Sequence, residues 1–269
     1  MKPQNSNVLV IGAAGGIGRH LSRILLDEGA RLGLVALHPE ELEKLGDFLP
    51  QARADDFFLH QADVTREEAR EGCVQAMEEN FGGVDILVNL AGINAFRPFE
   101  EQNPEQIERL MEINILSPML MTRAVLPGML ERGRGQIVNI GSTFGSIGFP
   151  CFTSYCTSKF ALRGFSQSLR RELAGTGVAV TYVAPRAVHT PINPPEVYEM
   201  ADKINMHFDQ PEKVADRIAR AIASERKECY IGFPESFFAR LNAILPGLVD
   251  LSLDRQSRIV HGYARQGNG

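Results

Sequence analysis

The chain alternates short apolar runs with longer segments in which apolar residues recur every three or four positions. The short runs are typical of strands buried on both faces, and the longer segments are typical of helices that cover a sheet. Seven runs are predicted to be strands: residues 8–11, 32–37, 57–64, 85–92, 135–142, 178–183 and 228–232. Because helical segments separate them, the pattern predicts an α/β fold with a doubly wound parallel sheet.

Two of the predicted helices carry local signals. The helix over residues 104–129 contains Pro118, which should bend it or loosen a turn near Asn114. Asn114 itself lies among apolar residues and therefore needs hydrogen-bond partners. Further upstream, Thr65 is predicted to cap the helix that follows it, with Glu68 at the capping-box position.

The carboxyl-terminal third has a different composition. Residues 186–210 are rich in proline and form a long irregular stretch, which predicts a lid or substrate loop. Residues 233–253 form an amphipathic extension interrupted by Pro246. Three interpretations of this extension stay open: packing on its own subunit or on a partner, capping an apolar substrate pocket, or lying on a membrane surface. No linker or repeat divides the chain, so residues 1–269 are predicted to form a single domain.

Composition excludes several classes of function. The 269 residues carry a net charge of −5, which does not fit the basic surface of a nucleic-acid-binding protein. No apolar run reaches 18 residues, so no membrane-spanning helix is expected. The first residues lack the basic and apolar regions of a secretory signal. The four cysteines form no CxxC pair and no histidine cluster accompanies them, which favours a cytoplasmic location without a zinc site or disulfide framework.

A glycine-rich turn follows the first predicted strand. It reads Gly12-Ala13-Ala14-Gly15-Gly16-Ile17-Gly18 and leads into a helical segment. Glycines in this position let the backbone approach a pyrophosphate, whose charge is stabilised at the helix amino terminus. The spacing is Gly-x-x-x-Gly-x-Gly rather than the usual GxGxxG, and a tight turn without a ligand is the alternative.

The end of the second strand bears on the choice of cofactor. Dinucleotide folds place an acid there to bind the ribose 2′-hydroxyl of NAD, or a basic residue to bind the 2′-phosphate of NADP. The sequence Val35-Ala36-Leu37-His38 has no acid and no arginine. The cofactor is therefore predicted to be NADP(H) or NAD(H), with a lean toward NADP(H). His38 is either a phosphate contact or an exposed residue at a helix start.

The candidate catalytic pair is Tyr155 and Lys159, four residues apart in a segment, 153–174, that is predicted to be helical. At this spacing the two side chains share one helix face. A nearby ammonium group favours the phenolate, so Lys159 is expected to lower the pKa of Tyr155 and to prepare it for general acid–base catalysis. Ser142, at the end of the fifth strand, could hydrogen-bond a substrate oxygen. The alternative for both residues is ordinary packing and turn formation.

Taken together, these residues resemble the short-chain dehydrogenases/reductases in their single-domain form, over roughly residues 7–232. Their catalytic tetrad is matched, in order, by Asn114, Ser142, Tyr155 and Lys159. The cofactor residues that the resemblance assigns are Gly12, Gly16, Ile17, Gly18, His38, Asp63, Val64, Asn89, Ala91, Gly92, Tyr155, Lys159, Pro185 and Thr190. This chain departs from the family pattern with Ile11 for threonine, Leu90 for asparagine and Arg186 for glycine.

The resemblance implies a Rossmann-type sheet and an NAD(P)-dependent oxidoreductase. Tyr155 would exchange the proton of the substrate hydroxyl, Ser142 would hydrogen-bond the substrate oxygen, and Lys159 would hold the nicotinamide ribose. Asn114 would place a water that links Lys159 to solvent. Asp63 would contact adenine, and Thr190 would steady the nicotinamide amide. No metal is implied. The resemblance also implies a homodimer or homotetramer built through residues 104–130 and 153–174.

The expected substrate is a small molecule, an alcohol or ketone. The apolar loop and extension suggest a hydrophobic compound of steroid, retinoid or lipid-like type. Two other functions stay open. A sensor or scaffold protein could bind the cofactor without turnover. An enoyl reductase could use the same fold, although the enoyl reductases of this family usually space the tyrosine and lysine more widely.

Overall fold

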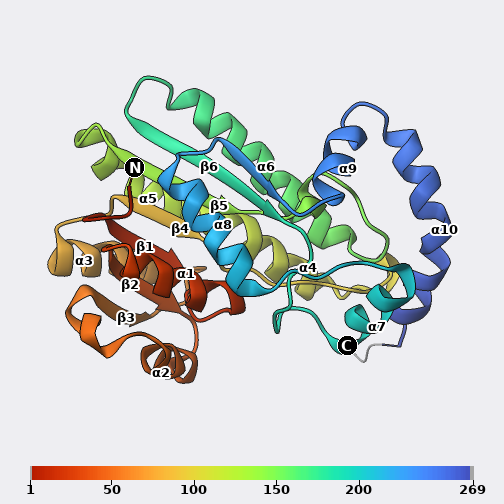
Figure 1. The fold of residues 1–269 in the computed structure, drawn as a ribbon, viewed down its shortest axis with the longest axis horizontal. Helices are drawn as coiled ribbons and strands as arrows, with labels where there is room; N and C mark the ends of the chain where they lie inside the picture. The colour runs from red at the N-terminus through yellow and green to blue at the C-terminus, as the bar shows by residue number, and fades with distance from the viewer. Residues whose placement is uncertain (1, 267–269) are drawn as a thin grey trace.

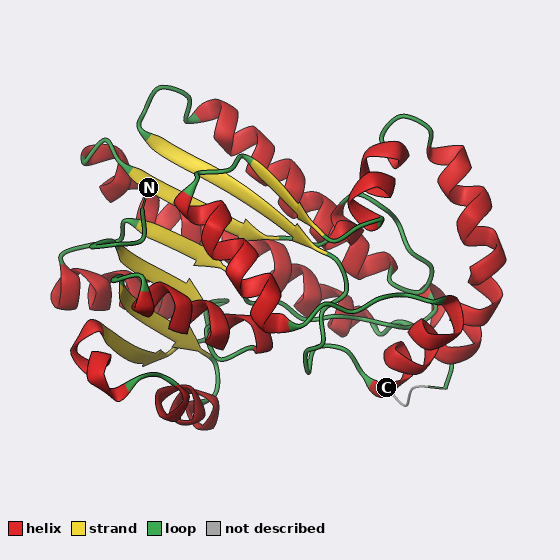
Figure 2. Ribbon diagram, viewed as in Figure 1, coloured by secondary structure: helices red, strands yellow, loops and turns green. Residues whose placement is uncertain are grey.

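Seven parallel strands form one sheet in the order β3-β2-β1-β4-β5-β6-β7 (Figures 1 and 2) in the computed structural model, which describes residues 2–266. The strands are β1 (Asn7–Ile11), β2 (Arg31–Ala36), β3 (Phe57–Gln61), β4 (Ile86–Asn89), β5 (Gly135–Ile140), β6 (Val178–Pro185) and β7 (Glu228–Ile231). The chain moves outward in one direction from β1 to β3, and in the other from β4 to β7. The predicted doubly wound parallel sheet is therefore confirmed, and its switch point lies between β1 and β4.

Helices cover both faces of this sheet. Their bounds are α1 (Gly16–Asp27), α2 (Pro39–Phe48), α3 (Glu67–Phe81), α4 (Pro104–Met111), α5 (Ser117–Glu131), α6 (Thr153–Glu172), α7 (Pro195–Ile204), α8 (Pro211–Ala223), α9 (Glu235–Asn242) and α10 (Pro246–Ala264). On one face, α1 packs against α8 and α2 lies over β2 and β3. On the other face, α3, α5 and α6 lie over the central strands.

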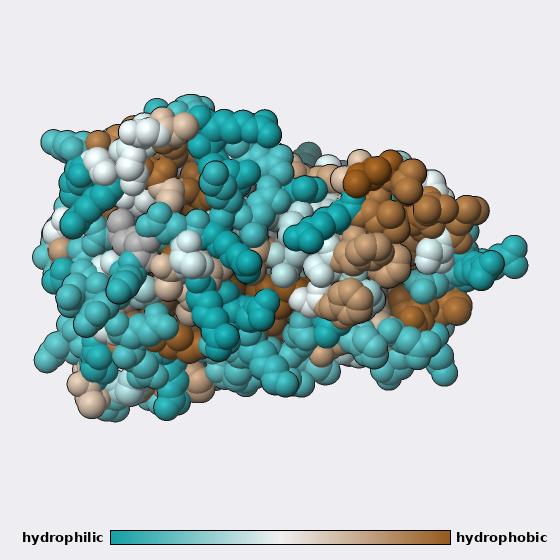
Figure 3. All heavy atoms as spheres, turned by 45° about the horizontal axis from the view of Figure 1, so that its top comes forward, coloured by the Kyte–Doolittle hydropathy of each residue, from teal (hydrophilic) through white to brown (hydrophobic). Residues whose placement is uncertain are grey.

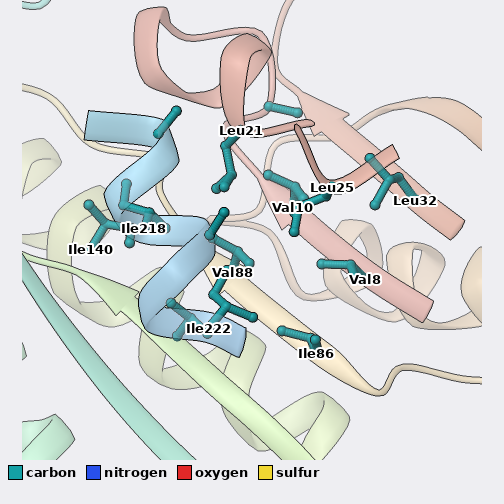
Figure 4. Packing of buried hydrophobic residues seen from close by; sticks show 14 of the residues in the cluster. Val8, Val10, Leu21, Leu25, Leu32, Ile86, Val88, Ile140, Ile218 and Ile222 are labelled. Atoms are coloured by element: carbon teal, nitrogen blue, oxygen red, sulfur yellow. The ribbon is translucent and has the colours of Figure 1, made fainter. Parts of the chain in front are cut away.

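The alternation of side chains along β1 shows how the two faces are filled. Val8 and Val10 point into the core beneath α1 and α8 (Figure 4), whereas Leu9 and Ile11 point into the core beneath α3 and α5. All four are almost completely buried. Burying a side chain of this size stabilises a fold by about 1.5–3 kcal/mol, so a strand buried on both faces anchors the sheet strongly.

The long helix predicted over residues 104–129 consists of three pieces. A π-helical turn, Glu112–Leu116, separates α4 from α5, and the prediction of a loosened turn near Asn114 is confirmed. By length and composition alone, the run Pro104–Glu131 is long and apolar enough to cross a bilayer, a test that helices packed in a protein core also pass. In this fold α5 packs against the sheet through Met121, Val125 and Met129.

Two other local predictions were wrong. Thr65 does not cap the following helix, which begins at Glu67 with Arg66 as its N-cap residue. The Thr65 hydroxyl instead donates to the Asp63 carboxylate at 2.6 Å and accepts from Nη1 of Arg109 at 3.1 Å, so its oxygen is engaged away from the helix amides. The stretch 186–210 is not irregular throughout, since it contains α7. Pro195 occupies the first turn of this helix, where a missing amide hydrogen has no cost.

The carboxyl-terminal extension forms a helical hairpin at the end of the molecule opposite α2 and β3 (Figure 1). Pro246 interrupts the helical pattern as predicted, and it begins α10. α10 runs on to Ala264, well past the predicted end at residue 253. It packs against α7, which joins the extension to the predicted substrate loop.

Candidate active site

The predicted cofactor residues gather where the carboxyl ends of β1, β4 and β6 meet. Gly12 has a φ of +85°, and a Cβ atom added to it would lie 2.6 Å from the amide nitrogen of Ala91. The backbone after β4 therefore passes directly over the first glycine. In turn, the amides of Leu90 and Ala91 donate to the carbonyl of Ile11 at 3.0 and 2.9 Å. Only glycine fits at position 12.

Two other glycines of the turn, Gly16 and Gly18, are similarly constrained. A Cβ atom on Gly16 would lie 2.6 Å from Cγ2 of Thr190, and one on Gly18 would lie 2.4 Å from the carbonyl oxygen of Gly12. Gly16 is also the first residue of α1, with Ile17 next in its first turn. The structure thus brings together Gly12, Gly16 and Thr190 at a helix amino terminus, which is suited to hold a phosphate group.

Two loops meet across this edge. Asn94, after β4, donates from Nδ2 to Oδ1 of Asn193, which follows β6, at 3.2 Å. Pro185 is the buried last residue of β6. Asn89 is directed differently, because its Nδ2 donates to Oδ1 of Asn139 at 2.8 Å inside the sheet. Asn89 thus anchors β4 to β5 directly before the turn that contains Ala91 and Gly92.

The residues expected near adenosine lie at the ends of β2 and β3. His38 is exposed at the start of α2, and its side chain makes no capping hydrogen bond. Asp63 accepts hydrogen bonds from Thr65 and from Arg109, whose Nη2 lies 3.4 Å from Oδ2. Burial alone would raise the pKa of the Asp63 carboxyl, but the bonds with Thr65 and Arg109 outweigh it, and the pKa is lowered. Val64 is buried beside it.

The catalytic candidates converge on the same edge. Lys159 is buried, its Nζ donates to the carbonyl of Ile140 at 3.3 Å, and it lies 5.6 Å from the centre of the Tyr155 ring. A Cβ atom on Gly92 would lie 3.5 Å from the same Nζ. Ser142 Oγ accepts from the amide of Phe144 at 3.1 Å and hydrogen-bonds Tyr155. Ser142, Tyr155 and Lys159 are therefore brought together as predicted.

Asn114 reaches this group from the π-helical turn. Its Oδ1 accepts from the amide of Ile93 at 2.9 Å, and its Nδ2 donates to the carbonyl of Ile93 and to Oγ of Ser158. The completely buried amide is thus well satisfied, as its apolar surroundings require. These bonds tie α4–α5 to α6 and to the loop that begins at Gly92. Such π turns inside α-helices occur frequently at functional sites.

Proton affinities in the site differ from the expectation that Lys159 lowers the pKa of Tyr155. Burial raises the pKa of Tyr155 to about 12, and the hydrogen bond with Ser142 only partly counteracts this. Burial lowers the pKa of Lys159 to about 8. The cause is geometric, because the ammonium group lies beside the ring and donates to Ile140. Desolvation then acts on both groups and disfavours the charged form of each.

An aromatic cluster beside Tyr155 was not found from the sequence. Phe144 and Phe152 each lie 6.4 Å from the Tyr155 ring, centre to centre, and Phe96 stacks on Phe152 at 4.7 Å. Apolar residues of α7 and α10 belong to the same cluster: Val197, Met200, Leu253, Val260 and Tyr263. The cluster joins segments far apart in the chain, so no local pattern indicates it. The run Phe149–Phe152 is the one signal that was available.

Arg186, the residue that replaces a family glycine, also has a structural role that the sequence did not reveal. Its guanidinium binds Asp209 through two hydrogen bonds of 3.0 and 2.8 Å. It also donates to the carbonyl of Phe233 and to Glu235, at 3.0 and 3.1 Å. This single side chain therefore links the end of β6, the end of the substrate loop and the start of α9.

Comparisons with known proteins agree with this geometry. A family model described as short chain dehydrogenase matches residues 6–200. Dehydrogenase/reductase SDR family member 7B of Bos taurus is 31% identical over 257 residues, which cover 91% of this chain and 79% of the relative. A 2,3-dihydroxy-2,3-dihydro-p-cumate dehydrogenase of Pseudomonas putida is 34% identical over 238 residues, covering 86% and 88%.

Among solved structures, a short chain dehydrogenase from Burkholderia cenocepacia in complex with NADP has a TM-score of 0.79 at 24% identity. The match covers 94% of this chain and 99% of that one. The likeness shows the same fold. Together with the family model and the two relatives, it leads to a plain conclusion: the chain belongs to the short-chain dehydrogenase family of oxidoreductases.

Proposed function

We propose that this protein transfers a hydride between a nicotinamide cofactor and an alcohol or ketone, with Tyr155 as the proton donor or acceptor. The observation that carries the proposal is the meeting of Ser142, Tyr155 and Lys159 beside the glycine turn. This meeting supports proton exchange and cofactor binding at one sheet edge, which is the arrangement that hydride transfer needs.

The residues at this edge fit a dinucleotide. The backbone of Gly12 and Gly16 forms a cradle in which a Cβ atom would clash, at the amino terminus of α1. Thr190 and Gly92 would lie beside the nicotinamide, and Asp63 beside the adenine. When bound, the cofactor supplies the hydride acceptor or donor. The end of β2 carries no acid to bind the ribose 2′-hydroxyl of NAD(H), and on that ground we favour NADP(H) over NAD(H).

In the reductive direction the partly buried, protonated Tyr155 donates its hydroxyl proton to the substrate oxygen. Ser142 hydrogen-bonds the same oxygen and orients it toward Tyr155. Lys159 contributes positive charge beneath the ring and holds the ribose of the cofactor. Asn114 fixes the loop at Ile93 and the start of α6, so the three side chains stay in register.

The substrate is proposed to be hydrophobic. Tyr155 lies against Phe144 and Phe152, and Met206 and Phe208 of the substrate loop belong to the same apolar cluster. A steroid, retinoid or lipid-derived ketone fits such surroundings better than a charged metabolite does.

We also propose a homodimer or homotetramer. The π-helical turn and α5 together expose Leu116, Met119 and Leu130 along one stripe, and α6 exposes Phe160. These are the two helices through which the family resemblance predicts subunit contact. A Phe160→Glu variant should lower the mass measured by light scattering, whereas an unchanged mass would contradict this interface.

The experiment that tests the function is a cofactor-oxidation assay of the purified protein. NADPH and NADH are each supplied with a panel of hydrophobic ketones, an enoyl thioester and a charged keto acid. Oxidation with a hydrophobic ketone, and its loss in Ser142→Ala, supports the proposal. Cofactor binding without turnover across the panel would contradict it and favour a sensor, and turnover of the enoyl thioester alone would favour an enoyl reductase.

A further inference from the structure

The α9–α10 hairpin exposes apolar side chains at its tip. Ile244 is 77% exposed, and Leu245, Leu248 and Leu251, which follow it through the turn into α10, are at least half exposed. On α9, Phe237 is 55% exposed. Figure 3 shows these hydrophobic atoms gathered at the end of the molecule over α9 and the start of α10. A surface of this kind on a soluble protein marks an interaction site.

The three sides of α10 have different surroundings. The inward side packs on the body of the protein through Val249 and Val260, which are buried. A second side lines a groove against the start of α6, and it carries Asp250 and Asp254. The third side faces solvent, where Leu248 and Leu251 are followed by Arg255 and Arg258 at helical spacing.

Charge is therefore segregated around the hairpin. Both acids of α10 face the groove, and the acid of α9, Glu235, is paired with Arg186. The outward arginines are Arg240, Arg255 and Arg258, and none of them has an ion-pair partner among residues 2–266. The whole chain is negative, at −5, yet the outward side of α10 is apolar and basic, while the exposed Asp250 and Asp254 lie on its groove side.

We propose that the tip of the α9–α10 hairpin docks on a lipid bilayer that contains anionic lipids. The apolar tip would enter the boundary between headgroups and acyl chains. Arg255 and Arg258 lie about 6 and 10 Å along the helix from Leu251, at 1.5 Å per residue. Amphipathic surface helices bury their apolar faces to about 5–10 Å, so the two arginines would meet the lipid phosphates.

A second copy of the chain fits this surface less well. A twofold interface must be complementary to itself, so arginines that lie near its symmetry axis would face each other. A protruding tip that is apolar around the Ile244–Leu248 turn also offers little flat area for a rigid partner. A lipid bilayer can bury the apolar side chains of the tip in its fluid interior, and its phosphate groups can pair with the arginines.

Membrane docking itself does not depend on the proposed oxidoreductase function. Only its suggested role, bringing the active site near a hydrophobic substrate, rests on that function. The inward side of α10 belongs to the apolar cluster that contains Phe144, Phe152 and Tyr155. α10 would thus have the bilayer, with any hydrophobic substrate dissolved in it, on its outer side and the apolar cluster around Tyr155 on its inner side.

The test is co-sedimentation of the full chain with vesicles of phosphatidylcholine alone, or of phosphatidylcholine with one third phosphatidylglycerol. The variants are Leu248→Gln/Leu251→Gln and Arg255→Gln/Arg258→Gln. The matched control is Leu59→Gln, an exposed leucine on the edge strand β3. Because the chain contains no tryptophan, the sedimented protein is quantified by gel densitometry rather than by fluorescence. NADPH binding, measured by calorimetry, shows that each variant is folded.

The wild type and Leu59→Gln should sediment with the anionic vesicles. The leucine variant should stay in solution. The arginine variant should bind about 25-fold more weakly, because each arginine near the surface contributes roughly fivefold to anionic membranes. No sedimentation of the wild type with either vesicle overturns the proposal. A change in oligomeric mass of the leucine variant without vesicles, with vesicle binding unchanged, also overturns it and identifies a second copy as the occupant. Neither outcome depends on catalytic turnover.

Discussion

The glycine edge of the sheet and the α9–α10 hairpin are built from opposite kinds of contact. At the edge, backbone atoms approach so closely that Gly12, Gly16 and Gly18 leave no room for a Cβ atom. In the hairpin, large side chains such as Ile244 and Leu251 are mostly exposed and contact little of the protein. The first region therefore tolerates almost no change in shape. The second region can accept changes of its exposed side chains without loss of packing, so its sequence can adapt to a different surface or substrate.

The sharpest test of the edge is removal of the proton donor. Tyr155→Phe keeps the ring that packs on Phe144 and Phe152 but loses the hydroxyl. We expect kcat to fall about 10³-fold, within the usual range for general acid–base catalysis, with NADPH affinity nearly unchanged. Steady-state kinetics and calorimetry measure the two quantities. Activity within tenfold of the wild type would show that another group moves the proton.

The backbone contact at Gly12 gives the next largest effect. Gly12→Ala places a Cβ atom at a positive φ and against the Ala91 amide, which should lower the free energy of unfolding by about 2 kcal/mol and weaken cofactor binding. Denaturant unfolding and NADPH titration measure both. The matched control is Gly72→Ala in α3, where nothing closer than 3.9 Å meets the new atom. That variant should be as stable as the wild type or more so. Equal effects of the two substitutions would refute the close-contact argument.

The pH dependence tests the electrostatics of the edge. Lys159 must keep its proton to hold positive charge in the site, and its pKa is about 8. In the reductive direction, kcat/KM should therefore be level below pH 8 and fall about tenfold per unit above it. Tyr155, with a pKa of about 12, stays protonated over this range and adds no second step. Lys159→Arg should abolish the fall, whereas a wild-type profile that stays level to pH 10 would contradict the assignment.

The smallest effect is expected where the two regions are joined. Arg186→Lys keeps the charge but loses the two-pronged contact with Asp209, so the start of α9 should open more often. We expect KM for a hydrophobic ketone to rise a few-fold with kcat unchanged, and amide exchange in α9 to become faster. Lys213→Arg on α8 is the matched surface control. An altered kcat with unaltered exchange would show that Arg186 acts on the chemistry instead.

Much of the edge could be predicted because its signals are local. The glycine turn, the seven apolar runs and the Tyr155–Lys159 spacing are each contained in a few consecutive residues. The position of Asn114 near a loosened turn followed from Pro118 in the same way. The helix caps and strand ends were less exact, since at Thr65 the hydroxyl is engaged by Asp63 and by Arg109, which lies 44 residues further along the chain.

The parts that could not be predicted depend on contacts between distant segments. From the sequence alone, Arg186 is expected to be an exposed loop residue. In the structure it forms ion pairs with Asp209 and Glu235, which are 23 and 49 residues away in the chain. The aromatic cluster around Tyr155 draws on residues from 96 to 263. The proton affinities of Tyr155 and Lys159 follow from burial, which spacing alone does not give.

The π-helical turn at Glu112–Leu116 has a consequence for how this chain can evolve. Such a turn is equivalent to one residue inserted into an α-helix. Deleting Ile113 would remove this extra residue from the run Pro104–Glu131, although Pro118 would still deny the shortened helix one backbone hydrogen bond. It would also rotate one end of that helix by about 100° relative to the other, so Asn114 and α5 could not both keep their contacts. A shorter, more regular descendant would thus be an inactive one, and natural deletions should be tolerated in neighbouring loops before they are tolerated here.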